Sequence, residues 1–150
     1  MYFCRKYKGK LTTIENYKHS IPIQIRFSDI DALSHVNNSF FAQYYDVGRI
    51  YYFEEVMKEK IDWTEIVVVI VNIEINFISP ILQGDNIYVE SKLTNFGNKS
   101  MKMEQRLIDK KTGIVKSNCK TILSGFDRLT NTSIKIPEDF KTKFLEYEQE

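Results

Sequence analysis

The chain has 150 residues, enough for one domain, 1–150, with a hydrophobic core of its own. Its formal net charge of +1 excludes strong electrostatic attraction, so neither nucleic acid nor a membrane is an expected partner. The two cysteines, Cys4 and Cys119, are too few for a disulfide framework or a zinc site. No apolar run follows the basic N-terminus as in a signal peptide, so the expected location is cytoplasmic.

The first part of the chain predicts an arm and a strand. Residues 1–18 mix Lys, Tyr and Thr without a clear period, which indicates an irregular N-terminal arm. From Ile21 to Phe27 every second residue is apolar, the pattern of a half-buried strand. Pro22 has no amide hydrogen and therefore belongs at the start of this strand or on a sheet edge.

A long helix is predicted from about Ser39 to about Lys58, and either Asn37 or Asn38 can cap its first turn. Two rows of apolar side chains run along it, and a helix that is apolar on several faces must be largely surrounded. The rows are Phe40, Tyr44, Val47, Tyr51 and Phe41, Tyr45, Gly48, Tyr52. Gly48 costs about 1 kcal/mol relative to Ala within a helix, which indicates that another backbone approaches closely.

Alternation with a period of two returns in four segments, 71–77, 87–94, 101–107 and 114–126, each separated from the next by turn residues. A short terminal helix follows Ile136, with Phe140 and Phe144 on one side. The order is therefore one strand, one long helix and four strands. It predicts an α+β architecture in which an antiparallel sheet curls around the long helix.

Polar side chains suited to chemistry gather where the predicted helix begins. Two carboxylates, one imidazole and two carboxamides lie within ten residues: Asp29, Asp31, His35, Asn37 and Asn38. A helix start offers amide groups without acceptors and a partial positive charge. A carboxylate beside such donors is suited to acyl transfer, because the amides can stabilise the oxyanion that forms on a carbonyl.

This segment resembles the hotdog-fold acyl-CoA thioesterases, in particular the 4-hydroxybenzoyl-CoA thioesterase family. The residues that carry the resemblance are Arg26, Asp29, Asp31, His35-Val36-Asn37-Asn38, Tyr44-Tyr45-Asp46, Arg49, Pro80, Gly84-Asp85, Gly97 and Lys99-Ser100. It covers roughly residues 21–145. It implies a hotdog fold and the hydrolysis of an acyl-CoA or acyl-carrier-protein thioester, without metal or cofactor.

The resemblance also implies roles for single residues. Asp31 matches the catalytic aspartate, which acts as nucleophile or as general base, and His35 is the second catalytic candidate. The substrate carbonyl would bind at the helix start, near Asn37 and Asn38. Leu33 departs from the plant acyl-carrier-protein thioesterases, which have Asn there. Ser34 stands where many members have Gly, and Asp46 replaces the more usual Glu.

Each of these roles has a structural alternative. Asp31 can instead cap the turn, since Asp is common in turns, and His35 can be an oriented structural imidazole. Asn37 and Asn38 can be helix caps, and Asp29 is expected to be a turn or strand-end residue. At the level of function, the alternatives are a non-enzymatic acyl-thioester-binding protein and a hydroxyacyl dehydratase. The dehydratases carry a His-Phe-Pro motif that is absent here.

A homodimer or homotetramer is expected, because a sheet wrapped on one helix leaves an edge that needs a partner. The candidate edge is the uncharged run 66–70. The resembled family pairs such edges across a two-fold axis and builds each active site between two subunits. By that arrangement, residues 78–82 of one chain would approach Asp31 of the other.

Overall fold

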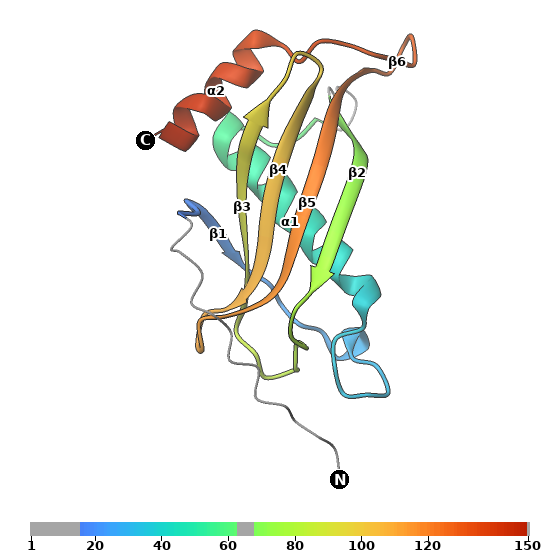
Figure 1. The fold of residues 1–150 in the computed structure, drawn as a ribbon, viewed down its shortest axis with the longest axis vertical. Coiled ribbons are helices and arrows are strands. Elements are labelled where there is room, and N and C mark those ends of the chain that lie inside the picture. The colour runs from blue at the N-terminus through green and yellow to red at the C-terminus, as the bar shows by residue number, and fades with distance from the viewer. Residues whose placement is uncertain (1–15, 63–67, 150) are drawn as a thin grey trace.

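The computed structural model describes residues 16–62 and 68–149. The predicted arm therefore lies almost wholly outside the described residues, as do Ile66 and Val67 of the predicted edge. The elements in chain order are β1 (His19–Pro22), a 3₁₀ turn (Phe27–Asp29), α1 (Asn38–Met57), β2 (Val68–Phe77), β3 (Ile87–Phe96), β4 (Ser100–Asp109), β5 (Ile114–Asp127), β6 (Thr132–Ser133) and α2 (Glu138–Gln149) (Figure 1).

The strands form one sheet in the order β1-β3-β4-β5-β2, in which all neighbours are antiparallel, and the short β6 pairs with β5. Figure 1 shows α1 lying obliquely along one face of this sheet. The expected α+β class and hotdog arrangement are confirmed. Within the described residues, neither helix combines the length and the apolar character needed to cross a membrane.

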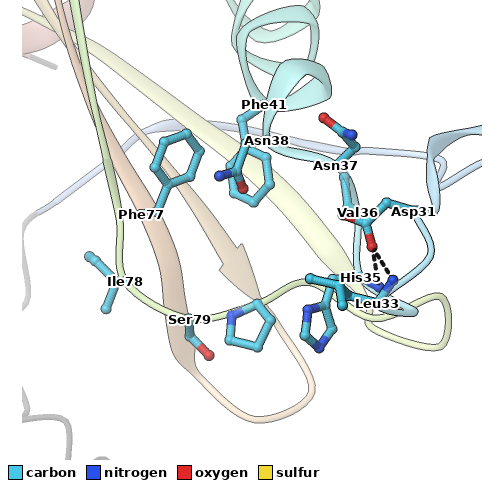
Figure 2. A pocket seen from close by; sticks show the side chains of 11 residues that line it. Asp31, Leu33, His35, Val36, Asn37, Asn38, Phe41, Phe77, Ile78 and Ser79 are labelled. Atoms are coloured by element: carbon cyan, nitrogen blue, oxygen red, sulfur yellow. Dashed lines mark hydrogen bonds between the residues drawn. The ribbon is translucent and has the colours of Figure 1, made fainter.

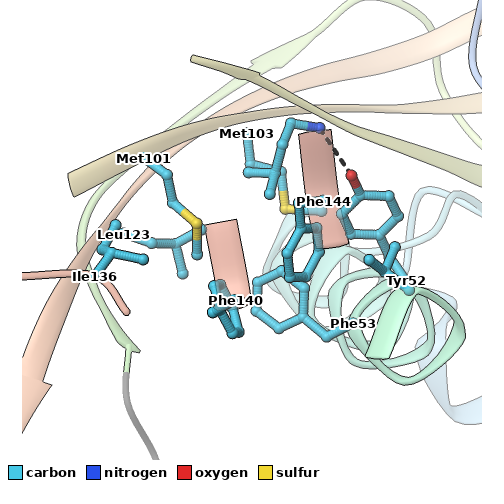
Figure 3. Packing of buried hydrophobic residues seen from close by; sticks show 10 residues of the cluster. Tyr52, Phe53, Met101, Met103, Leu123, Ile136, Phe140 and Phe144 are labelled. Carbon is cyan, nitrogen blue, oxygen red and sulfur yellow. Dashed lines mark hydrogen bonds between the residues drawn. The ribbon is translucent and has the colours of Figure 1, made fainter. Parts of the chain in front are cut away.

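The predicted alternation places the expected side chains against α1. The inner faces of the three central strands carry the buried residues Ile87, Val89, Leu93, Met101, Met103, Leu107, Cys119, Thr121 and Leu123. Buried apolar side chains form two clusters, one near each end of α1. The cluster at the C-terminal end includes Phe140 and Phe144 of α2, as the pattern predicts (Figure 3). The cluster at the N-terminal end packs beneath the candidate site.

Gly48 allows α1 to approach the sheet. An ideal Cβ on Gly48 would lie only 2.6 Å from a methyl carbon of Val89 in β3. Real Cβ atoms do not come so close to a neighbour, so any side chain at this position would push the helix away from the sheet. The predicted close approach is confirmed, although its nearest atoms belong to a side chain rather than to a backbone.

Two predictions about these elements are wrong. The first strand was predicted at 21–27 but covers only His19–Pro22. After Pro22 the chain leaves the sheet, and side-chain bonds between Arg26 and Asp29 close the 3₁₀ turn that follows. The long helix is not surrounded on all sides, since Val47 is 39% exposed and Tyr51 is 50% exposed. Both belong to the row that begins at Phe40, in which only Tyr44 is buried.

Strand β2 is an edge of the sheet, as predicted. It pairs with β5 on one side, and no described residue pairs with it on the other. A bulge at Val71 interrupts its register, and Val71 and Ile73 are 59% and 40% exposed. In Figure 1 the last residues of β2 lie at the same end of the molecule as the start of α1. This placement brings the edge strand to the candidate site.

Candidate active site

The loop from residue 30 to residue 37 is closed by its own backbone. The amide of Asp31 donates to the carbonyl oxygen of His35 at 2.8 Å, and the amide of Ser34 donates back to the carbonyl oxygen of Asp31 at 3.0 Å. Ser34 has a φ of 63°, a left-handed conformation that favours glycine. This explains why many members of the resembled family have Gly at this position, and the serine here accepts some backbone strain.

The two carboxylate oxygens of Asp31 have different surroundings. Oδ1 accepts the amide of Leu33 at 2.8 Å and the amide of His35 at 3.4 Å (Figure 2). Oδ2 accepts no hydrogen bond from a described residue. Asp31 therefore does cap the turn, but only through Oδ1. These two hydrogen bonds fix the orientation of its side chain. The other oxygen remains free for chemistry.

Asn37 is the N-cap of α1, so its side chain is engaged in structure. Its Oδ1 accepts the amide of Ser39 at 2.9 Å and the hydroxyl of Ser39 at 2.8 Å. The carbonyl oxygen of Asn37 accepts the amide of Phe40 at 2.9 Å. Among the described residues, the amide of Asn38 then has no acceptor. A helix N-terminus with a free amide provides a donor and a partial positive charge.

All four predicted site residues line one pocket of about 490 Å³, between the loop, the start of α1 and the end of β2. Its lining consists of Asp31, Leu33, His35, Val36, Asn37, Asn38, Phe41, Phe77, Ile78, Ser79 and Pro80 (Figure 2). The amide of Val36 donates to the carbonyl oxygen of Ile81 at 2.8 Å, which joins the two sides of the pocket. The apolar side chains Phe41 and Phe77 lie together on one side.

Residues 78–80 reach the pocket within the same chain as Asp31. The resemblance instead implied that they would approach Asp31 of a second subunit. The hydrogen bond between Val36 and Ile81 holds them beside the loop in a single chain. A second copy is therefore not needed for this contact.

Asp29 holds the start of the loop in place. As expected, it belongs to a turn, and it does not line the pocket. It is completely buried, and its carboxylate accepts hydrogen bonds from the hydroxyl of Tyr44 at 2.6 Å and from Arg26 Nε at 3.1 Å. Burial alone would raise the pKa of Asp29, but the bonds from Tyr44 and Arg26 and the positive charge of Arg26 outweigh it and lower the pKa below its usual range.

Lys116 supports the far wall of the pocket, and nothing in the sequence distinguishes it from the other lysines. It lies at a bulge in β5, where the pairing with β4 shifts register. Its carbonyl oxygen accepts the amides of Ile78 and Ser79 at 2.9 and 3.0 Å. Its buried Nζ donates to the carbonyl oxygen of Pro80 at 3.0 Å and pairs with Asp85 at 2.7 Å. One side chain and its backbone therefore hold the segment that faces Asp31.

No metal centre is found in the described part of the chain, where no group of three or more His, Cys, Asp or Glu side chains has a suitable arrangement. Of the two cysteines, Cys4 lies outside the described residues, and Cys119 is buried with its sulfur 3.6 Å from the hydroxyl oxygen of Thr121. The groups that the described residues bring to the candidate site include a carboxylate, an imidazole and a helix amide.

Comparison with solved structures supports the fold assignment. A thioesterase from Thermus thermophilus, complexed with coenzyme A and Zn, is 26% identical with a TM-score of 0.76, and the match covers 86% of this chain and 98% of that one. A predicted thioesterase from Bacillus stearothermophilus is 21% identical with a TM-score of 0.77, over 85% and 93% of the two chains. At this identity the second likeness shows the fold alone.

A hypothetical protein from Staphylococcus aureus in complex with CoA is also similar in fold, with 16% identity and a TM-score of 0.75 over 86% of this chain and 82% of that one. No curated protein matches the sequence. The model of the thioesterase-like superfamily matches residues 25–144, which include every candidate site residue. Because this match covers most of the sequence, the chain belongs to the thioesterase-like superfamily.

Proposed function

We propose that this protein is an acyl-CoA thioesterase that hydrolyses its substrate in the pocket between Asp31 and the start of α1. The observation that carries the proposal is that Asp31 and Asn38 line the same pocket, while among the described residues Oδ2 of Asp31 has no donor and the amide of Asn38 has no acceptor. A carboxylate and an oxyanion donor on either side of one small space are what acyl transfer to water requires. The family and the solved thioesterases support hydrolysis of a thioester in general.

In the proposed reaction, the Asn38 amide donates to the thioester carbonyl oxygen and stabilises the negative charge that develops there. Removing one such donor costs about 10²–10³ in rate in other enzymes. Asp31 then acts in one of two ways. As a general base it takes a proton from water while the water oxygen attacks the carbonyl carbon, the C–S bond breaks and the thiolate takes up a proton.

As a nucleophile, Oδ2 of Asp31 attacks the carbonyl carbon directly, the thiolate leaves, and water hydrolyses the resulting anhydride. Both routes give a free acid and a thiol, and both begin from the same carboxylate oxygen. His35 lines the same pocket and is proposed to assist proton transfer. Neither route requires a metal, so activity should survive exhaustive treatment with a chelator.

A panel of acyl-CoA and acyl-carrier-protein substrates, followed by release of the free thiol, tests this function. Wild-type protein should release thiol, and Asp31→Asn should not. Tight binding without release would instead identify an acyl-thioester-binding protein. Hydration of an enoyl-CoA, detected by loss of its conjugated double bond, would identify a hydratase. Loss of activity on chelation that added metal restores would contradict the proposed metal-free chemistry.

We further propose that two copies associate through the edge of β2, in a homodimer or a homotetramer. Exposed apolar side chains on this strand and on α1 support the proposal: Val47, Tyr51, Ile70 and Val71. A two-fold arrangement of two such edges would close the assembly, whereas an unpaired edge invites open-ended association. The strand edge and the exposed side chains of Val47 and Tyr51 would then be covered together.

Sedimentation equilibrium at micromolar concentration tests the assembly. We expect a mass of two or four times the chain mass of 17.7 kDa. Val71→Glu, which places a charge on the proposed interface at a residue that is 59% exposed, should give monomers. The control is Leu129→Glu, because Leu129 is 96% exposed in the turn before β6 and should tolerate a charge. A fully active wild-type monomer would contradict the proposed oligomer.

A further inference from the structure

Phe77 forms the wall of the pocket opposite the loop that carries Asp31. It is the last residue of β2, and its partner across the sheet is the buried Ser117, which places the ring on the inner face. The ring meets Phe41 of α1 edge to face, with centroids 5.0 Å apart and an interplanar angle of 79°. Phe41 is 2% exposed and held by the core, whereas Phe77 is 50% exposed. One ring of the pair is thus fixed and the other has open space beside it.

The two rings lie on the side of the pocket where an acyl chain would extend. In Figure 2, Phe77 lies on one side, Asp31 and His35 lie on the other, and Phe41 and Asn38 lie between them. A thioester carbonyl bound at the Asn38 amide carries a sulfur and an acyl chain as substituents. The part of the substrate that is attached to the sulfur contains amide groups, so it favours the polar, open side of the pocket. The apolar acyl chain favours the aromatic rings.

More apolar surface lies beyond the ring pair. Ile75 and Ile73 precede Phe77 on the inner face of β2, opposite the buried residues Cys119 and Thr121 of β5. Ile73 is 40% exposed, so this surface is partly open. A long acyl chain could gain contact with it only by passing Phe77. The Phe41–Phe77 pair therefore separates the pocket from the apolar strip behind it.

We propose that Phe77 determines the specificity of this site by limiting the substrate to short-chain acyl thioesters. The proposal rests on the proposed thioesterase function. Phe77 lines the pocket and is also the next residue after Ile75 and Ile73 along the inner face of β2. Phe41 cannot play this part, since it is held in the buried cluster.

The test is a homologous series of straight-chain acyl-CoA substrates, with kcat/KM measured for each length. Each methylene that the pocket buries should raise kcat/KM about fourfold, from ~0.8 kcal/mol per buried CH₂, until the chain meets Phe77. Beyond that length the wild-type series should level off or fall. Phe77→Ala should move the break to longer chains, and Phe77→Trp should move it to shorter ones.

Phe27→Ala is the matched control, because Phe27 is 84% exposed and does not line the pocket. It should leave the break where the wild type has it. Phe77→Leu keeps most of the apolar volume and guards against a folding defect in Phe77→Ala. If Phe77→Leu and Phe77→Ala are both folded and the break does not move in either, the proposal is wrong.

The same series, measured as binding to Asp31→Asn by calorimetry, separates this proposal from the proposed function. A break in affinity that moves with Phe77 would support the inference even if the wild type hydrolyses nothing. Hydrolysis with no dependence on residue 77 would overturn the inference and leave the thioesterase function standing. The absence of both hydrolysis and acyl-CoA binding would overturn both.

Discussion

The hydroxyl of Tyr44 donates a 2.6 Å hydrogen bond to Oδ2 of Asp29, a carboxylate that is completely buried. Tyr44 belongs to α1, and Asp29 directly precedes the loop that carries Asp31. The carbonyl oxygen of Asp29 also accepts the amide of Asn37 at 2.8 Å. The loop and the helix start are therefore joined twice at Asp29, and this fixes the position of Asp31 relative to the Asn38 amide.

Tyr44→Phe should destabilise the protein by about 1.5–3 kcal/mol, the usual contribution of a hydrogen bond to a charged group. The substitution removes the hydroxyl and leaves the buried carboxylate with fewer donors. Urea unfolding measures the effect. Tyr88→Phe in β3 is the control, since no described residue forms a hydrogen bond with the Tyr88 hydroxyl, and it should change stability by less than about 0.5 kcal/mol. Equal effects of the two substitutions would contradict the anchoring role.

The stability of the protein should depend on Asp29 at acid pH. Despite burial, the hydrogen bonds from Tyr44 and Arg26 lower its pKa in the folded state, so the folded state holds the proton less tightly than the unfolded chain. The stabilisation is then present above the pKa of the unfolded state, near 4, and is lost as the pH falls through the lower folded pKa. The stability difference between wild type and Asp29→Asn should shrink over this range. If the difference in unfolding free energy between wild type and Asp29→Asn stays constant from pH 7 to pH 3, the lowered pKa of Asp29 is contradicted.

Asp31→Asn should lower kcat by about 10²-fold or more while the protein stays folded. The amide oxygen of Asn can still accept the Leu33 amide, but the charge required for attack or proton abstraction is lost. Asp127→Asn is a matched control, because Asp127 also accepts the amide two residues later, Leu129, at 2.8 Å, and lies outside the pocket. If Asp31→Asn keeps more than a tenth of the wild-type kcat, which corresponds to a barrier change under ~1.4 kcal/mol, the role of Asp31 is contradicted.

His35→Ala should reduce kcat less than Asp31→Asn, by at most about tenfold. His35 lines the pocket, but no described residue forms a hydrogen bond with its ring, whereas a primary base is usually oriented by a partner. Leu33, where the plant enzymes have Asn, is 74% exposed and offers no such partner. Steady-state kinetics of the two variants side by side decide the ranking. If both are folded and equally inactive, His35 is a primary catalyst.

Gly48→Ala should destabilise the protein, by about 1–3 kcal/mol, although alanine is the better helix former. The new Cβ would meet both methyl carbons of Val89, at 2.6 and 2.7 Å. Thermal unfolding measures the change, and Val89→Ala in the same chain should recover part of it. At Gly84, where an added Cβ meets nothing within 4 Å, the same substitution should be neutral or slightly stabilising. A stabilising Gly48→Ala would show that the helix can move.

Local pattern was enough to predict most of the elements. Strands β3, β4 and β5 follow the period of two, and α1 and α2 begin where cap residues and Pro137 indicate. The first strand was the exception, because the alternation up to Phe27 also fits an extended segment that has left the sheet. Arg26 and Asp29 close the 3₁₀ turn through side-chain bonds that periodicity does not report.

The fold class, the family and the group of polar residues at the helix start could be predicted from the sequence, because all of these depend on residues near one another along the chain. The three-dimensional arrangement was needed to see that, among the described residues, Oδ2 of Asp31 has no donor and one amide at the helix start has no acceptor, and that residues 77–80 line the same pocket as Asp31. The contact of Lys116 was likewise visible only in the structure, where the bulge in β5 brings its Nζ to the carbonyl oxygen of Pro80. These contacts join residues that are distant along the chain, as with Lys116 and Pro80, which are 36 positions apart. Their positions follow from sheet order and register, which no local pattern encodes.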